Sequence, residues 1–477
     1  MTHSLKTDIC VIGAGAGGLS VAAGAAQLGL KVALIEKGEM GGDCLHTGCV
    51  PSKSLIAAAA RAHAFKNSRA FGITPHTPEI DFAAVNDHIH DVIARIEPHD
   101  SQERFEGLGV TVFREAARFL SPRKVRAGKT EIHARYFVIA TGSRPFVPDL
   151  PGLDPNKVFT NETIFTLREA PPRLVIIGGG PIGMEMAQAH ARLGSQVTVI
   201  EAGGILSKDD PELVGILRQR LRGEGVEIFE NTNIQTVRHG PDMAADITIE
   251  QDGDTKVVNG THLLVATGRR PVLEGLDLDT AGVAATEHGI TVDSRLRTSQ
   301  KHILAVGDVT GGPQFTHMAG YHAGIVIRNV IFKQFARLDN TAVPWVTYSD
   351  PELANVGLTE PQARQKYGDT VRVTSWNLKD IDRAKAERIE DGMIKVTSLK
   401  NGRILGASIL APHAGDHLPL WSLAISHRMK LKEIAGLILP YPTLGEISKS
   451  AASAFYKPVL FSPRTQKLAR LLIKLPF

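Results

Sequence analysis

The sequence predicts an α/β protein with two Rossmann-like domains and a C-terminal α+β domain. Three observations predict this architecture. A βαβ-type segment occurs twice, a short apolar motif follows each copy, and the glycine-rich segments stop near residue 343. A chain of 477 residues is also too long for a single hydrophobic core, so several domains are expected.

The repeated segment has the pattern of a dinucleotide-binding unit. Residues 8–38 read DICVIGAGAGGLSVAAGAAQLGLKVALIEKG, and residues 173–203 read RLVIIGGGPIGMEMAQAHARLGSQVTVIEAG. Each copy predicts a strand, a glycine-rich turn, a helix and a second strand that ends in glutamate. The glycines let the backbone approach a pyrophosphate at the helix N-terminus, and the glutamate can accept hydrogen bonds from ribose hydroxyls. The shared positions are Gly13, Gly15, Gly18 and Glu36 in the first copy and Gly178, Gly180, Gly183 and Glu201 in the second.

Shorter motifs predict how the domains connect. Residues 140–142 and 266–268 both read ATG and follow an apolar run, which indicates strands that return the chain from one unit to the next. Residues 303–312 (ILAVGDVTGG) predict a further strand that ends near Asp308. From Pro344 onward, strands alternate with polar helices. The expected domains are residues 1–148 with 273–343, residues 149–272, residues 344–461, and a tail of residues 462–477.

Composition and charge exclude several classes of protein. The chain is 43% hydrophobic and 22% charged, as in ordinary soluble proteins, and it has no run of eighteen apolar residues. Three cysteines cannot build a disulfide framework, so a cytoplasmic location without a signal peptide is expected. The net charge of +4 comes from residues 457–477, which hold five basic residues and no acidic one. The rest of the chain is nearly neutral, which argues against a nucleic-acid partner.

Two of the cysteines lie in residues 41–53, GGDCLHTGCVPSK, whereas Cys10 falls inside the first strand and is expected in the core. A Cys-x4-Cys pair in a cytoplasmic protein is a redox disulfide, half of a metal site or a coincidence. No further soft ligands stand nearby, so no metal site is expected. Cys49 precedes Pro51 and a helix-forming run, and a helix N-terminus stabilises a thiolate. We therefore expect Cys44 and Cys49 to be a redox-active pair.

This segment and the two fingerprints resemble the FAD-dependent pyridine nucleotide-disulfide oxidoreductases, the family of dihydrolipoamide dehydrogenase and mercuric reductase. The resemblance implies FAD on the first fingerprint and NAD(P) on the second, with residues 344–461 as the dimerisation domain of a homodimer. Cys49 would then be the thiol beside the flavin that forms the charge-transfer complex, and Cys44 the thiol that faces the substrate.

Further site residues are carried over by the same resemblance. Lys53, paired with Glu185, would lie near the flavin N5, although the two residues could also be a solvated charge and a residue that favours its helix dipole. Glu36 would bind the adenosine ribose and Asp308 the ribitol chain. Other cofactor contacts are expected at Lys37, Gly42, Ala117, Thr141, Gly142 and Gly268.

The C-terminal motif departs from the disulfide reductases of this family. Their His-Pro-Thr segment, followed by Glu, supplies a histidine base, whereas this chain has Tyr441 before Pro442, Thr443 and Glu446. A phenol that titrates near pH ~10 is a poor proton shuttle for a thiol at neutral pH. Mercuric reductases also have tyrosine there, but they use a C-terminal cysteine pair, and this chain has no cysteine after Cys49. Candidate substitute bases are His317, His322, His413 and His417.

The expected function is oxidation of NAD(P)H with electron transfer through FAD and the cysteine pair to an acceptor. A small-molecule or protein disulfide, a metal ion or a quinone could be that acceptor. Glu201 is followed by no basic residue before Lys208, so NADH is expected to be preferred over NADPH. Two alternatives stay open: a dihydrolipoyl dehydrogenase with a substitute base, and a flavin/thiol redox sensor or membrane-associated binding protein.

The tail predicts a short basic amphipathic helix. Leucines at positions 468, 471, 472 and 475 fall on one helical face, with basic residues at 467, 470 and 474 beside it. Pro463 suits the start of this helix and Pro476 its end. The leucines could dock on the chain's own body or on the partner subunit, or the helix could contact anionic lipid or a membrane partner.

Overall fold

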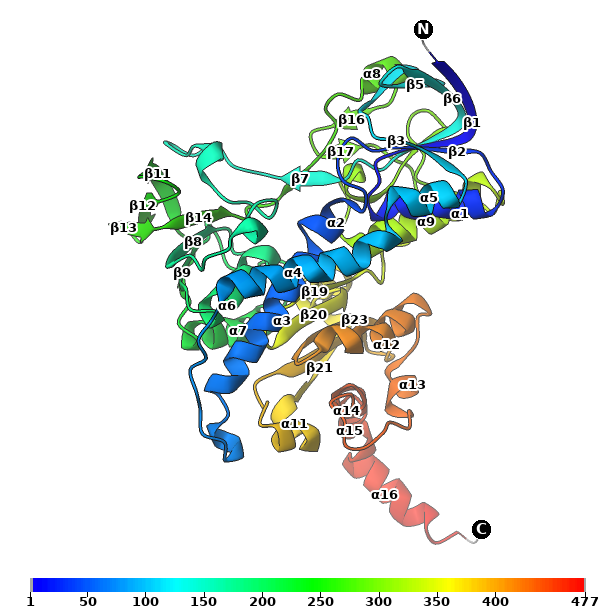
Figure 1. Cartoon of the computed structure of the whole chain (residues 1–477). Coiled ribbons are helices and arrows are strands. Elements are labelled where there is room, and N and C mark those ends of the chain that lie inside the picture. Colours follow the sequence, from blue (N-terminus) through cyan, green and yellow to red (C-terminus); the bar gives the residue numbers. More distant parts are fainter. Residues whose placement is uncertain (1–2, 476–477) are drawn as a thin grey trace. The chain divides into compact units, whose positions relative to one another are not determined.

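The computed structural model describes residues 3–475, which form two compact units (Figure 1). Unit 1 comprises Met1–Asn67, Pro75–Ala202 and Ile228–Asp339. Unit 2 comprises Ser68–Thr74, Gly203–Glu227 and Asn340–Phe477. Both units mix helices and sheets, which confirms the α/β class.

A seven-stranded sheet forms the first part of unit 1. Its order is β3-β2-β1-β6-β5-β4, with β18 paired to β6, and the pairs β1–β2, β2–β3, β1–β6 and β6–β18 are parallel. Cys10 is fully buried in β1, as expected. Helices α1 (Ala16–Gln27) and α9 (Thr316–Val330) share one apolar core with strands of this sheet. The strands are β1 (His3–Ile12), β2 (Val32–Ile35), β3 (Val110–Phe113), β4 (Ala117–Ser121), β5 (Lys124–Ala127), β6 (Thr130–Ile139) and β18 (Ile303–Ala305).

The second fingerprint builds a smaller parallel sheet in the same unit. Its order is β10-β9-β8-β14, and helix α6 (Pro181–Arg192) follows β8 as α1 follows β1. A three-stranded antiparallel sheet, β11-β12-β13, shares an apolar core with this sheet. The strands are β8 (Arg173–Ile177), β9 (Gln196–Ile200), β10 (Glu227–Phe229), β11 (Asn233–His239), β12 (Ala245–Gln251), β13 (Asp254–Gly260) and β14 (His262–Val265).

The two ATG motifs lead into strands that pair with each other. Strand β7 (Ser143–Pro145) pairs antiparallel with β15 (Arg269–Pro271). The contacts are reciprocal: the Thr141 hydroxyl donates to the Val272 carbonyl at 2.7 Å, and the Thr267 hydroxyl donates to the Phe146 carbonyl at 2.7 Å. This strand pair brings together the residues that follow the two ATG motifs. The motifs alone did not predict this contact.

The cysteine segment forms two consecutive helices, α2 (Gly42–His46) and α3 (Cys49–Lys66). Helix α3 begins at Cys49, which places this thiol at a helix N-terminus, as expected. Helix α4 (Phe82–Ile96) runs alongside α3 in Figure 1. The smaller helices and strands of unit 1 are α5 (Gln102–Gly107), α8 (Leu278–Ala281), β16 (Ala285–Thr286) and β17 (Gly289–Ile290).

Unit 2 is built on a five-stranded antiparallel sheet of order β19-β20-β23-β22-β21. Lys395 on β22 is nearly buried, and its ammonium contacts the carboxylates of Asp210, Glu212 and Glu360 at 3.0, 3.0 and 3.1 Å. This cluster ties the start of α7 to the sheet. The strands are β19 (Pro344–Thr347), β20 (Glu352–Gly357), β21 (Val371–Asn377), β22 (Met393–Leu399) and β23 (Ile404–Ala411). The helices before the tail are α7 (Pro211–Gly223), α10 (Glu360–Tyr367), α11 (Asp382–Glu387), α12 (Ala414–Ser426), α13 (Leu431–Ala435) and α14 (Glu446–Ala454).

The short helix α15 (Lys457–Leu460) precedes the tail, and the tail forms helix α16 (Pro463–Leu472). Helix α16 starts at the expected proline, and the Ser462 hydroxyl caps it by accepting from the Thr465 N–H at 3.3 Å. Pro476, the expected end, lies outside the described residues. No helix within residues 3–475 has both the length and the apolar character needed to cross a membrane.

Candidate active site

The turn between β1 and α1 has the shape that a dinucleotide pyrophosphate requires. Gly13 has φ = 105°, and a Cβ there would collide with the Ala140 carbonyl oxygen. Gly15 caps the N-terminus of α1, and a Cβ there would meet no atom within 4 Å. The second copy repeats this arrangement, with φ = 115° at Gly178 and open space at Gly180. Because a helix N-terminus with open space in front of it suits a phosphate, both turns fit a dinucleotide.

The two fingerprint glutamates are held in the same way. The Ala14 N–H donates to Glu36 Oε2 at 2.6 Å, and the Gly38 N–H donates to Oε1 at 2.7 Å. In the second copy, the Gly179 N–H donates to Glu201 Oε2 at 2.6 Å. Each carboxylate is therefore oriented by the backbone of its own glycine-rich turn, in the position that the fingerprint reserves for the ribose.

Other expected cofactor residues gather around the first turn. Gly42 opens α2 so close to Gly15 that a Cβ on Gly42 would lie 2.8 Å from the Gly15 Cα. Asp308 follows β18 and accepts from the Ser143 hydroxyl at 2.6 Å, and burial raises the pKa of this carboxyl. Of the remaining expected positions, Lys37 is exposed after β2 and Ala117 is buried at the start of β4. Thr141, Gly142 and Gly268 directly precede the paired strands β7 and β15.

Cys44 and Cys49 are free thiols, and the hydrogen bond between them shifts their pKa values in opposite directions. A hydrogen bond from Cys44 lowers the pKa of Cys49 to about 6, against the opposing effect of burial. Thr316, whose Oγ1 lies 3.5 Å from Cys49 Sγ, and the positive charge of Lys53 add to this lowering. The same hydrogen bond raises the pKa of Cys44. At neutral pH Cys49 is therefore the thiolate and Cys44 the protonated thiol.

Lys53 lies one helical turn after Cys49 and is paired with Glu185 of α6. The Lys53 Nζ donates to Glu185 Oε2 at 2.8 Å, and the Glu185 side chain is only 5% exposed. The structure thus brings together two residues 132 positions apart in the sequence. The partner also shows that Lys53 is more than a solvated surface charge.

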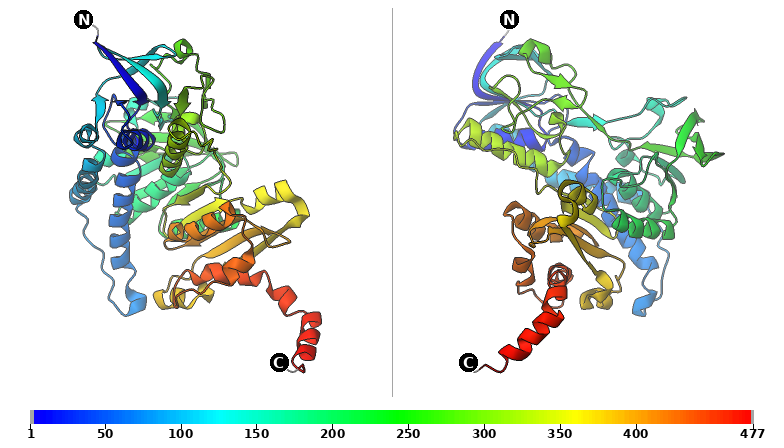
Figure 2. Two further views of the ribbon diagram at one scale, coloured as in Figure 1. Left: turned by 90° about the vertical axis from the view of Figure 1, so that its right-hand side faces the viewer. Right: turned by 180° about the vertical axis from the view of Figure 1, so that it is seen from behind.

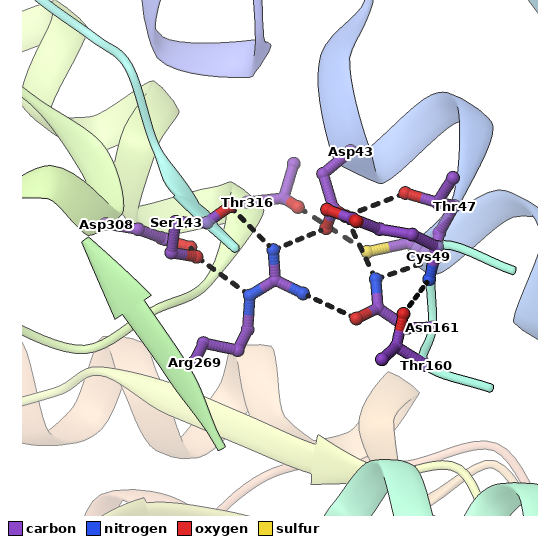
Figure 3. A network of polar contacts seen from close by, with 10 residues as sticks. Asp43, Thr47, Cys49, Ser143, Thr160, Asn161, Arg269, Asp308 and Thr316 are labelled. Atoms are coloured by element: carbon purple, nitrogen blue, oxygen red, sulfur yellow. Dashed lines mark hydrogen bonds and ion pairs between the residues drawn. The ribbon is translucent and has the colours of Figure 1, made fainter. Parts of the chain in front are cut away.

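Sequence reasoning missed a polar network beside the cysteines, shown in Figure 3. Arg269 at the start of β15 contacts Asp43, Asn161 and Ser143, and Ser143 in turn contacts Asp308. The one sequence signal was the position itself, because Arg269 directly follows the second ATG motif as Ser143 follows the first.

The other two catalytic candidates belong to unit 2. Tyr441 is exposed ahead of α14, and its hydroxyl donates to Asp382 Oδ2 at 3.1 Å. This hydrogen bond raises the pKa of Tyr441, so even less of the phenolate, the form that could accept a proton, is present at neutral pH. Glu446 begins α14 and accepts from the Thr443 N–H at 3.2 Å.

Of the candidate substitute bases, His322 is buried and accepts from the Gly307 N–H at 3.1 Å. Burial lowers the pKa of both His322 and His417. His317 stacks on Phe315, and His413 occupies the N-cap position of α12 without a capping hydrogen bond from its side chain.

The chain has two dinucleotide-binding units, and a thiolate–thiol pair lies beside the first of them. These features define an oxidoreductase that binds two nucleotides and transfers electrons through a pair of cysteines. Residues 7–323 match the family described as pyridine nucleotide-disulphide oxidoreductase, and residues 343–452 match its dimerisation domain. The chain belongs to this family of FAD-dependent disulfide oxidoreductases. The dimerisation domain supports the expected homodimer.

Its relatives include enzymes with different acceptors. The chain is 37% identical to a dihydrolipoyl dehydrogenase of Geobacillus stearothermophilus over 94% of this chain and 96% of that protein. It is 34% identical to a mercuric reductase of Streptomyces lividans over 95% and 97%. The solved Cu(II) complex of RclA, an HOCl-induced flavoprotein disulfide reductase from Escherichia coli, superposes with a TM-score of 0.83 at 28% identity, covering 94% and 99%.

Proposed function

We propose that this oxidoreductase oxidises NADH and uses the Cys44–Cys49 pair to reduce an acceptor in the manner of a mercuric reductase, with a soft metal ion as the favoured acceptor. The observation that carries the proposal is Tyr441, which stands where the disulfide reductases have their histidine base. Its phenol donates to Asp382 and has a raised pKa, so it does not provide a base for thiol–disulfide exchange. A metal ion accepts electrons without needing a proton from such a base. Three cysteines in the whole chain also support a reducing, cytoplasmic setting.

Several residues of the chain have distinct roles at the cysteine pair. Bound FAD supplies the two-electron exchange between the nicotinamide and the thiols. Thr316 and Lys53 favour the anionic form of Cys49, and Glu185 holds Lys53 in place. Cys44 keeps its proton and is assigned to the acceptor side. In the last step, the Cys49 thiolate and the Cys44 thiol lose two electrons and the one proton of Cys44 and become a disulfide, while a divalent ion such as Hg(II) gains both electrons.

An anaerobic acceptor panel tests this proposal. With NADH as donor, we expect Hg(II), Cu(II) or a quinone to be reduced much faster than lipoamide. Tyr441→His should raise lipoamide reduction by about 10²-fold, because a positioned general base contributes about 10²–10⁴-fold. Tyr441→Phe is the matched control and should leave every rate unchanged.

Two outcomes would contradict the proposal in different ways. Fast lipoamide turnover by the wild type, with no gain in Tyr441→His, would favour a dihydrolipoyl dehydrogenase that uses another base. No acceptor-dependent oxidation above the oxygen background, together with thiol-dependent partner binding, would favour a redox sensor.

We also propose that the tail places the enzyme on an anionic membrane surface. Leu468, Leu471, Leu472 and Leu475 are 52–63% exposed in the structure, so the body of unit 2 does not bury these leucines. Figure 2 shows α16 extending away from α14 within unit 2. The tail, together with α15 before it (residues 457–477), holds five basic residues and no acid, whereas the remaining chain has 49 basic and 50 acidic residues. Its charge therefore complements anionic lipid better than a second copy of this nearly neutral body.

Vesicle co-sedimentation tests the tail. The full chain should bind phosphatidylglycerol-containing vesicles at low salt, and binding should weaken as salt rises. Lys467→Gln/Arg470→Gln/Lys474→Gln keeps the apolar face, and should weaken binding about 100-fold because each basic residue near the surface contributes about 1 kcal/mol. Deletion of residues 462–477 should abolish binding and leave the dimer intact. Loss of the dimer on deletion, or no vesicle binding by the full chain, would instead support docking on the partner subunit.

A further inference from the structure

Arg269 is the centre of the polar network in Figure 3. Its side chain is 13% exposed, and its fork of N–H groups reaches three residues from different segments. The Nε donates to Ser143 Oγ at 2.8 Å, a terminal nitrogen donates to the Ser143 carbonyl at 3.0 Å, and the other donates to Asn161 Oδ1 at 3.2 Å. The guanidinium also pairs with Asp43 Oδ2 at 3.2 Å. Only arginine presents donors in this planar arrangement.

Asp43 connects this fork to the cysteine segment. Asp43 directly precedes Cys44, and its Oδ1 accepts from the Thr47 hydroxyl at 2.8 Å and from Asn161 Nδ2 at 3.0 Å. Asn161 Nδ2 also donates to the Thr47 carbonyl at 3.1 Å. The stretch from Asp43 to Thr47 is therefore held at both ends, with Cys44 inside it and Cys49 two residues beyond.

The network also balances charge around the thiolate. The groups that act on Cys49 are Cys44 first, then Thr316 and Lys53, and the carboxylate of Asp43 acts against them by raising the pKa of Cys49. Arg269 is the ion-pair partner of Asp43, and its charge also opposes the rise that burial causes in the pKa of Asp308, to which Ser143 donates at 2.6 Å. One guanidinium thus offsets the two carboxylates on either side of the site.

We propose that Arg269 and Asp43 are a pair of positioning residues. They hold the redox-active segment, residues 43–49, against the start of β15, and they set the electrostatic environment of the Cys49 thiolate. This role rests on Cys44 and Cys49 being the redox pair, and it goes beyond the choice of acceptor. It predicts that the two residues act on the thiolate in opposite directions. Removal of the arginine leaves a carboxylate without its counter-charge, and removal of the carboxylate leaves the arginine charge in excess.

The test measures the pH dependence of the thiolate–flavin charge-transfer absorbance of Cys49 in the reduced, FAD-loaded enzyme. Asp43→Asn keeps the shape of the side chain, and should lower the midpoint by about 0.5–1 pH unit. Arg269→Met should raise the midpoint by a similar amount, and Asp43→Asn/Arg269→Met should return it close to the wild-type value. Arg270→Met is the matched control, because Arg270 is the next residue of β15 and lies over the Phe146 ring at 3.8 Å.

Flavin absorbance verifies equal FAD content in all four variants, so a folding defect is distinguished from an electrostatic effect. Opposite shifts with recovery in the double variant support the proposal. Shifts in the same direction, or no shift in FAD-loaded Asp43→Asn, overturn it. Because this absorbance is measured without an acceptor, the result is independent of the acceptor panel, and the proposed metal-ion specificity could fail while the positioning role holds.

Discussion

Cys49→Ser is expected to lose acceptor reduction by about a thousandfold or more while FAD stays bound, because a hydroxyl cannot form the disulfide that returns the electrons. The long-wavelength thiolate–flavin charge-transfer absorbance should also disappear, since Cys49 is the thiolate of the pair. Anaerobic titration with NADH, followed by addition of the acceptor, measures both effects. Cys10→Ala is the control, because Cys10 is fully buried in β1 and is expected to leave both signals unchanged.

The two substitutions at Cys44 separate its two roles. Both Cys44→Ser and Cys44→Ala should lose acceptor reduction, since neither can form a disulfide with Cys49. The hydrogen bond from Cys44 is the largest cause of the lowered pKa of Cys49, about 6. Serine can still donate to the thiolate and alanine cannot, so the charge-transfer band should appear at higher pH in Cys44→Ala than in Cys44→Ser. Full acceptor activity in both variants would mean that electrons leave directly from the flavin.

NADH is expected to exceed NADPH in kcat/KM by about 100-fold, since a like-charge contact costs several kcal/mol. The reason is Glu201, whose carboxylate is fixed by the Gly179 N–H at 2.6 Å in the place reserved for the ribose. A carboxylate there accepts from a free 2′-hydroxyl and repels a 2′-phosphate. Steady-state kinetics with a common acceptor compares the two coenzymes.

Glu201→Gln is the matched variant for this prediction, because it removes the charge and keeps the size of the side chain. It should reduce the preference for NADH over NADPH mainly by lowering the KM for NADPH, with kcat changed little. Ala202→Arg should narrow it further by adding a positive charge beside the 2′-position. Equal or better efficiency of the wild type with NADPH would refute the role assigned to Glu201.

The sequence alone determined the features that depend on short stretches of chain. The glycine and glutamate positions repeated at a fixed spacing predicted both nucleotide-binding units, and the family match and the α/β fold confirm this class. The burial of Cys10, the place of Cys49 at the N-terminus of a helix and the start of α16 at Pro463 were also predicted. Local patterns suffice for these features, because strand periodicity, helix capping and turn geometry involve residues a few positions apart.

Only the tertiary structure decided which distant side chains meet. Arg269 pairs with Asp43, Cys49 lies against Thr316, and Tyr441 bonds Asp382. The first two pairs join segments more than two hundred residues apart, and no periodicity in the sequence encodes such contacts. The tail shows the same limit, since its leucine spacing predicted an apolar face but not whether the body covers it, and the structure leaves it exposed. Spacing determines which residues share a face of one element, whereas the packing of several elements determines what that face meets.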